Sequence, residues 1–340
     1  MFMTIGWLLA SLLISGLLVR GAIGYAHRRG LLDQPGQRRS HRLPTPRGGG
    51  IGIVVAALLC LPGILYSLPA AWSGQFIITL LSALLLVALT GWWDDHRALP
   101  VWPRLAAQLV AITAFSLSLL SAVDSLWWLP LLLVCGVWSI NLHNFMDGID
   151  GLLAQQAIFT GLGLSLLAWS VSQVALALAA ASLAAAAAGF GFYNRPPARI
   201  FMGDVGSGSV GLLIFAFSAM SWQRNPALLC PVLILSSAFV VDASLTLLGR
   251  ILRGRRWHAA HREHLYQWLA RRTGSHGRAD RVYLAWNLLV AAPLAWLAWS
   301  HPRLALATIM GTYLAAAIAW LVLKRRCLRR HPHKACHVPA

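Results

Sequence analysis

The sequence predicts an all-α, polytopic integral membrane protein with about 11 transmembrane helices. Three observations predict this fold class. Hydrophobic residues make up 58% of the 340 residues and charged residues only 11%, whereas a soluble domain carries roughly 25% charged residues. Apolar runs of about 20 residues, the length that a transmembrane helix needs, recur along the whole chain. Lys and Arg gather in alternate loops between these runs, as in a chain threaded through a membrane.

Eleven apolar runs are long enough to cross a bilayer as helices. They lie near residues 4–24, 50–70, 74–93, 103–122, 126–144, 152–170, 172–192, 206–222, 227–248, 282–299 and 303–323. The first run has no basic stretch before it, so we expect a retained helix and not a cleaved signal peptide. Five cysteines are scattered over apolar runs and the C-terminal tail, and their spacing predicts neither a disulfide framework nor a standard zinc site.

The basic residues also predict the orientation of the chain. The loops after the first, third, seventh and ninth runs are rich in Arg, whereas the alternate loops hold only Arg224 and Arg303. Because Lys and Arg accumulate in cytoplasmic loops, we expect a periplasmic N-terminus and a cytoplasmic C-terminus in a bacterial inner membrane. The net charge of +18 then reflects this rule, together with attraction to anionic lipids, and we expect no nucleic-acid partner.

We expect one transmembrane domain over residues 1–324, followed by a basic, disordered cytoplasmic tail over residues 325–340. The cytoplasmic loops that could carry a site are predicted near residues 25–49, 94–103, 145–151, 193–206 and 249–281. No polar stretch outside the apolar runs is long enough to build a separate soluble core. The lipid bilayer is therefore a predicted partner, and the sequence leaves open whether the chain forms a homo-oligomer.

Only ten Asp and Glu residues occur in the chain, so their placement is informative. Five of them fall at or just beyond the predicted cytoplasmic ends of the third, fifth and seventh runs, namely Asp94, Asp95, Asp147, Asp150 and Asp204. Any one of these motifs alone could be a solvated loop, because Asp and Gly are common turn residues. Three such motifs on one side of an acid-poor chain favour a common site instead.

Carboxylates beside arginines suit a site that binds a divalent cation and phosphate groups together. Mg²⁺ is usually held by one or two carboxylates together with substrate phosphates and water, and Arg side chains contact further phosphate oxygens. We therefore predict a Mg²⁺ site, in which Mn²⁺ could substitute. The Gly- and Ser-rich run 203–211 opens the next helix, where backbone N–H groups could contact an anion. This run lacks the Gly-Lys-Ser/Thr ending of a P-loop.

An ion-coupled transporter is the alternative class of function. Transporters place acidic residues near the middle of the membrane, often in broken helices. Here only Asp242 lies any distance inside a predicted span, and the clustered acids lie at helix ends. The pattern therefore favours an enzyme that works at the inner membrane surface.

Five segments, taken in order, are similar to the loop motifs of a known family. They are His41-Arg42-Leu43-Pro44-Thr45-Pro46-Arg47-Gly48-Gly49, Asp94-Asp95, Asn141-Leu142-His143-Asn144-Phe145-Met146-Asp147-Gly148-Ile149-Asp150-Gly151, Asn194-Arg195-Pro196-Pro197-Ala198-Arg199-Ile200-Phe201-Met202-Gly203-Asp204-Val205-Gly206-Ser207 and His261-Arg262-Glu263-His264-Leu265-Tyr266. The chain resembles the polyprenyl-phosphate N-acetylhexosamine-1-phosphate transferases (glycosyltransferase family 4), a superfamily that includes phospho-N-acetylmuramoyl-pentapeptide transferase. The resemblance implies transfer of a sugar 1-phosphate from a UDP-N-acetylhexosamine to undecaprenyl phosphate, with release of UMP.

The resemblance also implies a role for each matching residue. Asn144 and Asp204 would hold Mg²⁺, and Asp94 and Asp95 are the implied catalytic residues beside the lipid phosphate. The implied substrate-binding residues, with Arg104 as a basic pyrophosphate contact, are His41, Arg47, Arg104, Asp147, Asp150, Asn194, Arg262 and His264. We expect a single direct displacement, with a covalent aspartyl intermediate as the alternative.

The fifth segment departs from the family pattern. The muramoyl-pentapeptide branch carries consecutive histidines there and related hexosamine transferases carry His-x-His-His, whereas this chain has His264, Tyr266 and Gln267. Arg262 and His264 either share the phosphate contact or are members of a merely basic loop. The departure favours a subgroup that starts O-antigen or related polysaccharide synthesis over phospho-N-acetylmuramoyl-pentapeptide transferase. The sequence leaves the sugar open among N-acetylglucosamine, N-acetylgalactosamine and N-acetylfucosamine.

Overall fold

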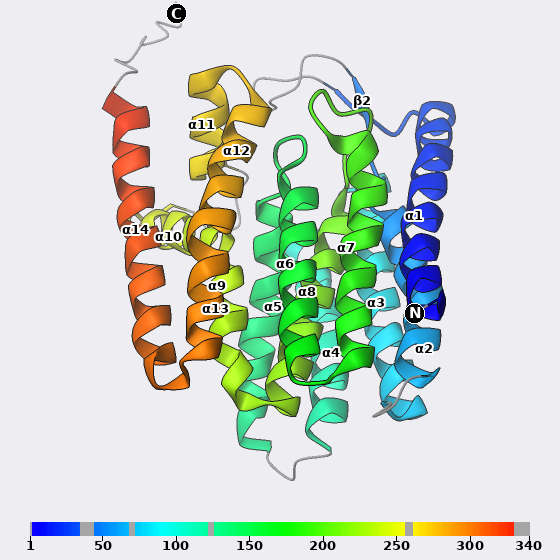
Figure 1. The fold of residues 1–340 in the computed structure, drawn as a ribbon. Helices are drawn as coiled ribbons and strands as arrows, with labels where there is room; N and C mark the ends of the chain where they lie inside the picture. Colours follow the sequence, from blue (N-terminus) through cyan, green and yellow to red (C-terminus); the bar gives the residue numbers. More distant parts are fainter. Residues whose placement is uncertain (1, 35–43, 68–71, 122–125, 256–260, 330–340) are drawn as a thin grey trace, which may run out of the picture.

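The apolar runs of the sequence fold into helices that lie side by side in one bundle (Figure 1). This computed structural model describes residues 2–34, 44–67, 72–121, 126–255 and 261–329. The helices that correspond to predicted spans are α1 (Phe2–Arg29), α2 (Ile51–Ser67), α3 (Gly74–His96), α4 (Val101–Leu120), α5 (Leu129–Phe145), α6 (Leu152–Ser170), α7 (Val174–Asn194), α8 (Asp204–Arg224), α9 (Leu229–Leu235), α10 (Ser237–Ile251), α12 (His276–Trp286), α13 (Ala292–Ser300) and α14 (Ala305–Arg329). The other elements include β1 (Leu32–Asp33), β2 (Thr45–Pro46), the short amphipathic helix α11 (Leu265–Thr273) and a π-helical turn (Asn287–Ala291) that joins α12 to α13.

The described residues contain nine helical segments that are long and apolar enough to cross a membrane, and one further span that is broken. The prediction of a helical, polytopic membrane protein is therefore confirmed, whereas the count of eleven straight spans is wrong in one place and reaches the limit of the described residues in a second. The run predicted at 227–248 breaks at Ser236 into α9 and α10, which are bent by 69°. Ser236 and Ser237 stand together at this break, and pairs of small polar residues are a common cause of sharp kinks.

The second place is α2, which was predicted to fill residues 50–70. The described part of α2, Ile51–Ser67, has 17 residues and is therefore about 25 Å long. Residues 68–71 lie outside the described residues, and so does the predicted end of this span.

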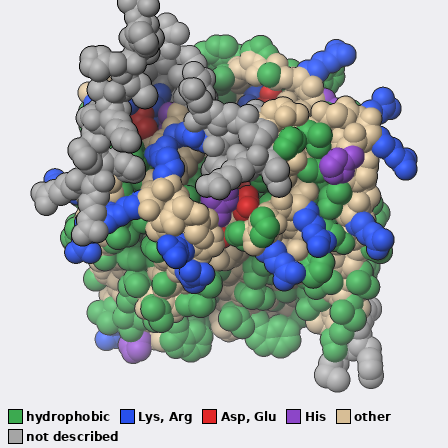
Figure 2. All heavy atoms as spheres, turned by 90° about the horizontal axis from the view of Figure 1, so that it is seen from above, with side chains coloured by type: hydrophobic (Ala, Val, Ile, Leu, Met, Phe, Trp, Pro, Cys, Tyr) green, Lys and Arg blue, Asp and Glu red, His purple; other side chains and the backbone are tan. Residues whose placement is uncertain are grey.

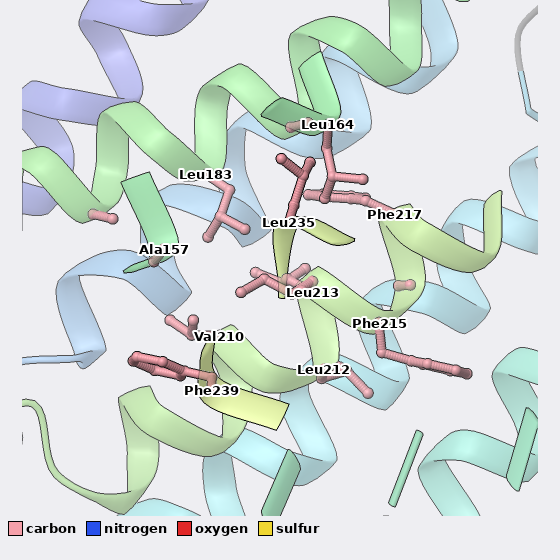
Figure 3. Packing of buried hydrophobic residues seen from close by; sticks show 14 of the residues in the cluster. Ala157, Leu164, Leu183, Val210, Leu212, Leu213, Phe215, Phe217, Leu235 and Phe239 are labelled. Atoms are coloured by element: carbon pink, nitrogen blue, oxygen red, sulfur yellow. The ribbon is translucent and has the colours of Figure 1, made fainter. Parts of the chain in front are cut away.

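Helix α8 occupies the centre of the bundle and packs against α2, α3, α5, α6 and α7. Of its membrane-spanning stretch, 89% is buried, so protein and not lipid surrounds it on all sides. Figure 3 shows side chains from α6, α7, α9 and α10 gathered around it, with the labelled α8 residues Val210, Leu212, Leu213, Phe215 and Phe217. The acidic residue at the start of α8 is therefore fixed by the core of the protein.

Glycines let the first turn of α8 approach its neighbours closely. A Cβ on Gly91 of α3 would lie 2.3 Å from the backbone oxygen of Asp204, and a Cβ on Gly50 would lie 2.2 Å from the Cα of Gly206. Small residues at such contacts allow two backbones in a membrane to pack directly against each other. The N-terminus of α8 is thus held between the start of α2 and the end of α3.

Main-chain hydrogen bonds join the first predicted loop to the fourth. The N–H of Gly49 donates to the carbonyl of Phe201 at 2.9 Å, and the N–H of Gly50 donates to that of Met202 at 2.8 Å. Strand β1 pairs antiparallel with β2 in the same loop. Two loops that are about 150 residues apart in the sequence therefore form one small platform at the end of the bundle where α11 also lies (Figure 1).

Two predictions concern residues that lie partly or wholly outside the described residues, the C-terminal tail and His41. Helix α14 continues to Arg329, so the first five residues of the predicted tail 325–340 extend the last helix instead of being disordered. The remainder of that tail and His41 lie outside the described residues.

We expect Gly91→Ala to lower the thermal unfolding midpoint of the detergent-purified protein by several degrees. A Cβ there would meet backbone atoms at 2.3 Å, and overpacking of this kind costs about 1–3 kcal/mol. Gly74→Ala is the matched control, because a Cβ at that position on the same helix meets nothing within 4 Å. Equal midpoints for the two variants would show that the close packing of α3 on α8 is not needed for stability.

Candidate active site

The loops at one end of the bundle surround a cavity of about 640 Å³. Figure 2 looks onto this end and shows Lys and Arg side chains spread around it, with acidic and His atoms visible between them. The residues that line the cavity come from all five predicted loop regions and are Asp33, Arg47, Asp95, Asp147, Gly148, Ile149, Asp150, Asn194, Phe201, Gly203, Asp204, His261, Arg262, Gln267, Ala270, Arg271, Gly274 and His276. The fold therefore brings the acidic motifs and the basic fifth loop to a single place.

Arg104 connects two of the acidic motifs. Its Nη1 lies 2.6 Å from Asp94 Oδ2, and its Nη2 lies 3.3 Å from Asp204 Oδ2. The other oxygen of Asp94 accepts a hydrogen bond from the N–H of Leu99 at 2.6 Å. A forked guanidinium suits this bridging position, because it donates along two parallel directions. Asp94 and Asp204 thus share one cation at the edge of the bundle.

Asp95 faces in a different direction from Asp94 and binds the start of α8. Its carboxylate accepts hydrogen bonds from the N–H groups of Asp204 at 3.0 Å and Val205 at 3.1 Å. Arg47 donates to the same carboxylate at 3.1 Å from Nε and 2.8 Å from Nη2. Gly203 precedes α8 with φ +75°, and a Cβ there would lie 2.6 Å from Asp95 Oδ2. The predicted catalytic residue Asp95 therefore serves first as the cap of a buried helix N-terminus.

Asn144 and Asp204, which were predicted to hold Mg²⁺, are in direct contact. Asn144 Nδ2 donates to Asp204 Oδ1 at 2.8 Å and to Ser207 Oγ at 3.0 Å. Coordination of one cation by both side chains needs the amide oxygen, so the amide would turn over from this arrangement. Among the described residues, no group of three or more His, Cys, Asp and Glu side chains is placed to hold a metal ion by itself. A Mg²⁺ ion rarely needs one, since substrate phosphates and water complete its shell.

Asp147 adds to the negative charge on the same wall of the cavity. Burial, followed by the nearby carboxylates of Asp204, Asp95 and Asp150, raises the pKa of Asp147 well above its ordinary value. The repulsion that favours a proton there also favours a bound cation, because either one offsets the crowded negative charge. The donor set therefore fits a divalent cation that is completed by phosphate oxygens.

Two predicted substrate-binding residues brace the loops. The side chain of Asn194 is buried and accepts from the N–H of Gly151 at 2.9 Å, while its Nδ2 donates to the carbonyl of Ile200 at 2.9 Å. Asp150 Oδ2 lies 3.2 Å from His276 Nδ1. The second oxygen of Asp150 is buried and has no hydrogen-bond partner in the described part of the chain. Asn194 fixes the shape of the cavity, whereas Asp150 retains an unused acceptor.

The two predicted site residues of the fifth loop lie in different surroundings. Arg262 lines the cavity, whereas His264 does not. His264 is buried, its ring stacks on those of His261 and Tyr266 at centroid distances of 4.9 and 5.6 Å, and its Nδ1 lies 3.8 Å from Asp242 Oδ1. Burial lowers the pKa of His261, which does line the cavity, to about 4. His261 is therefore neutral at pH 7, and the positive charge on this wall comes from arginine.

Five polar lining residues were not among the predicted site residues, namely Asp33, His261, Gln267, Arg271 and His276, although His261 begins the fifth motif. Gln267 and Arg271 are four residues apart on one face of α11, and Gly274 follows the end of this helix. A search for helical periodicity in the polar segment after the ninth run would have found this face. No sequence signal points to His276, because its approach to Asp150 depends on the turn between α11 and α12.

Comparison with known proteins decides the family. The sequence model of glycosyl transferase family 4 matches residues 77–222. The probable undecaprenyl-phosphate N-acetylglucosaminyl 1-phosphate transferase of Bacillus subtilis (strain 168) is 30% identical over 281 residues, which cover 76% of this chain and 74% of that protein. The chain belongs to glycosyl transferase family 4. The family assignment made from the loop motifs is thereby confirmed.

Two further relatives can be aligned with different shares of this chain. The decaprenyl-phosphate N-acetylglucosaminephosphotransferase of Mycobacterium tuberculosis (strain ATCC 25618 / H37Rv) is 28% identical and covers 87% of this chain and 83% of its own length. The phospho-N-acetylmuramoyl-pentapeptide-transferase of Lactiplantibacillus plantarum is 29% identical but covers 61% of this chain and 71% of its own length. The similarity to the first type therefore extends over more of the chain.

We expect Asp95→Asn to destabilise the protein more than Asp94→Asn does. The Asp95 carboxylate accepts three hydrogen bonds at Oδ1 and one at Oδ2. The amide of Asn keeps one acceptor oxygen, but its NH₂ group cannot accept the hydrogen bonds made to the other oxygen, and the negative charge is lost. Because a hydrogen bond to a charged group contributes roughly 1.5–3 kcal/mol, the loss should be about 3 kcal/mol in the free energy of unfolding. Thermal unfolding of both variants in detergent measures this, and an equal or larger loss for Asp94→Asn would contradict the capping role.

Proposed function

We propose that this chain transfers an N-acetylhexosamine 1-phosphate from a UDP-sugar to undecaprenyl phosphate and releases UMP. The observation that carries the proposal is the position of Arg104 between Asp94 and Asp204, with Asn144 in contact with Asp204. Within this arrangement Asp204 lines the polar cavity at the end of the helical bundle. Named relatives act on decaprenyl or undecaprenyl phosphate, which supports the same acceptor here.

The residues fit a bound Mg²⁺ ion, for which Mn²⁺ can substitute. Asn144 and Asp204 would hold the ion, and Asp147 would add to its electrostatic attraction from the cavity wall. When bound, the ion supplies neutralisation of the charge repulsion between the donor pyrophosphate and the acceptor phosphate. The two protein ligands lie on different helices, α5 and α8, which the core holds together.

The cavity offers the phosphates one acidic and one basic wall. Arg262 and Arg271 line the wall that belongs to the fifth loop and α11, and guanidinium groups there can bind pyrophosphate oxygens that face away from the cation. Phosphoryl transfer depends mainly on such positioning and charge neutralisation. A phosphate monoester has a second pKa near about 6, so the acceptor is largely ionised at pH 7 and needs no strong base.

In this proposal Asp94 positions the acceptor phosphate and Asp95 positions the start of α8, and neither carboxylate becomes covalently linked to the substrate. Both carboxylates already accept hydrogen bonds from an arginine and from backbone N–H groups. An aspartyl nucleophile would have to give up these partners before it could attack. Asp94 lies next to Arg104 and is suited to orient the acceptor phosphate, while Asp95 keeps the N-terminus of α8 in place. This arrangement supports direct displacement by the lipid phosphate over a covalent aspartyl intermediate.

We propose the type of sugar and the pathway from two observations, the sequence of the fifth loop and the share of this chain that each type of relative matches. The loop lacks consecutive histidines, His264 lies behind the cavity wall, and N-acetylglucosamine-type relatives cover more of the chain than a muramoyl-pentapeptide one. These observations favour a donor of the UDP-N-acetylglucosamine, N-acetylgalactosamine or N-acetylfucosamine type. They also favour a role at the start of O-antigen or related lipopolysaccharide synthesis over peptidoglycan synthesis.

The transporter alternative would need an acidic residue on an ion path through the membrane. Among the described residues, Asp242 is the one acid well inside a span, and its carboxylate oxygens already accept hydrogen bonds from protein donors.

The assay that tests the function uses purified protein with undecaprenyl phosphate and a panel of UDP-N-acetylhexosamines. UMP should appear with at least one sugar, stop on chelation with EDTA, and return with Mg²⁺ or Mn²⁺. Asp204→Asn should remove most of the activity, by about 100-fold or more, because it alters a proposed metal ligand. UMP release without any polyprenyl phosphate would contradict direct displacement. Activity of Asp204→Asn within threefold of wild type would contradict the metal assignment.

We further propose that the cavity faces the cytoplasm of a bacterial inner membrane. Figure 2 shows how strongly Lys and Arg gather at the cavity end, and positive residues accumulate on the cytoplasmic side. In a cysteine-free variant in spheroplasts, Ser300→Cys at the opposite end should react with a membrane-impermeant maleimide, whereas Arg278→Cys should react only after lysis. The reverse pattern would invert the proposed orientation. Both positions are exposed, so accessibility within the protein does not bias the result.

A further inference from the structure

A buried carboxylate outside the cavity connects four helices. Asp242 lies on α10, the second half of the broken span, and is 1% exposed. Its two oxygens accept hydrogen bonds from five donors, which are Thr246 Oγ1 at 3.2 Å, the N–H of Leu265 at 2.8 Å, the N–H of Tyr266 at 3.4 Å, Tyr283 OH at 2.7 Å and Trp320 Nε1 at 2.8 Å. The donors come from α10, α11, α12 and α14. The bend at Ser236 is what directs α10 across the bundle toward them (Figure 1).

Two of the five donors are the first backbone N–H groups of α11. Such groups have no partner within their own helix, so Asp242 acts as a cap that comes from a distant segment of the chain. A negative charge at this end also interacts favourably with the helix dipole. Asp242 therefore does for α11 what Asp95 does for α8.

Helix α11 forms part of the cavity wall through Gln267 and Arg271. Its other side contacts the acidic loop that follows α5. Tyr266 OH donates to the carbonyl of Phe145 at 2.9 Å, and a Cβ on Gly148 would lie 2.1 Å from the same hydroxyl. The start of α11 thus touches the anchor on one side and the proposed metal-binding loop on the other.

We infer that Asp242 is a positioning residue for the transfer reaction. It fixes the first turn of α11, and the first turn fixes how far the arginine-bearing wall stands from the acidic wall. A displacement of about 1 Å in such an arrangement can cost on the order of 100-fold in rate. The kinetic part of this inference rests on the proposed function, whereas the anchoring of α11 does not.

Asp242→Asn separates this role from general stability. The amide oxygen can take the place of one carboxylate oxygen, and the NH₂ group can donate to Tyr283, whose hydroxyl can accept instead of donating. An NH₂ group cannot accept from a backbone N–H, and the negative charge at the helix start is lost. The substitution therefore weakens the anchor of α11 and keeps the shape of the buried side chain.

The matched controls are Tyr283→Phe and Trp320→Phe. Each removes one donor to the same carboxylate, from α12 and from α14, at positions that do not line the cavity. These variants should lower the thermal midpoint while leaving the Michaelis constant and the rate per folded molecule within about threefold of wild type. Tyr266→Phe removes the hydrogen bond from α11 to the carbonyl of Phe145, so it should reproduce part of the Asp242→Asn defect.

The experiment combines kinetics with amide hydrogen exchange on the full-length protein, using undecaprenyl phosphate and UDP-N-acetylglucosamine. For Asp242→Asn we expect a KM for the UDP-sugar raised about tenfold and a kcat lowered about tenfold. Exchange in the segment 264–274 should be at least about tenfold faster, and the two controls should change neither. A purely structural role lowers the active fraction and leaves KM unchanged, so an unchanged KM with normal exchange in 264–274 would overturn the inference. If wild-type protein releases no UMP with UDP-N-acetylglucosamine, the kinetics are measured with the other UDP-N-acetylhexosamines of the panel. The absence of UMP with all of them means that the proposed function fails, and the exchange measurement still decides whether Asp242 anchors α11.

Discussion

The buried N-terminus of α8 is the constraint on which the rest of the site depends. A helix surrounded by protein cannot leave its first N–H groups to water, and Asp95 meets this need from α3. Arg47 then offsets the charge of Asp95, which ties the first loop to the same point. The positive φ angle of Gly203 and the absence of a side chain at Gly50 and Gly91 make room for these contacts. One electrostatic requirement of a central helix thus sets where the first acidic pair and the first loop must lie.

Adjacent residues on a helix point in directions about 100° apart, and the Asp94–Asp95 pair uses this angle. One carboxylate turns inward to the start of α8, while the other turns outward to Arg104. The basic side of the cavity is built differently, on the short helix α11, whose first turn is capped by a buried carboxylate of α10. The acidic wall is therefore part of the rigid core, and the arginine wall is an attached element with its own anchor.

The sequence predicted most of the helices because apolar runs and loop charges are local properties. Residues 152–170 were predicted as a span, and α6 has these bounds. The break at Ser236 was missed, because hydropathy averages over composition and does not register where a helix bends. Seven of the predicted site residues line one cavity, namely Arg47, Asp95, Asp147, Asp150, Asn194, Asp204 and Arg262, whereas Asp94, Arg104, Asn144 and His264 do not line it. Asn194 and His264 are held by contacts within the fold. Their partners are remote backbone groups and rings, which no motif spacing specifies.

The start of α2 has a consequence for how movements within the membrane reach the site. Its first turn is bonded to the cavity platform through Gly50 and Met202, and Gly50 packs directly against Gly206 in the first turn of α8. A displacement of α2 along its axis would therefore be transmitted to the start of α8, which carries Asp204. The site is mechanically coupled to the membrane-embedded part of the protein through this contact.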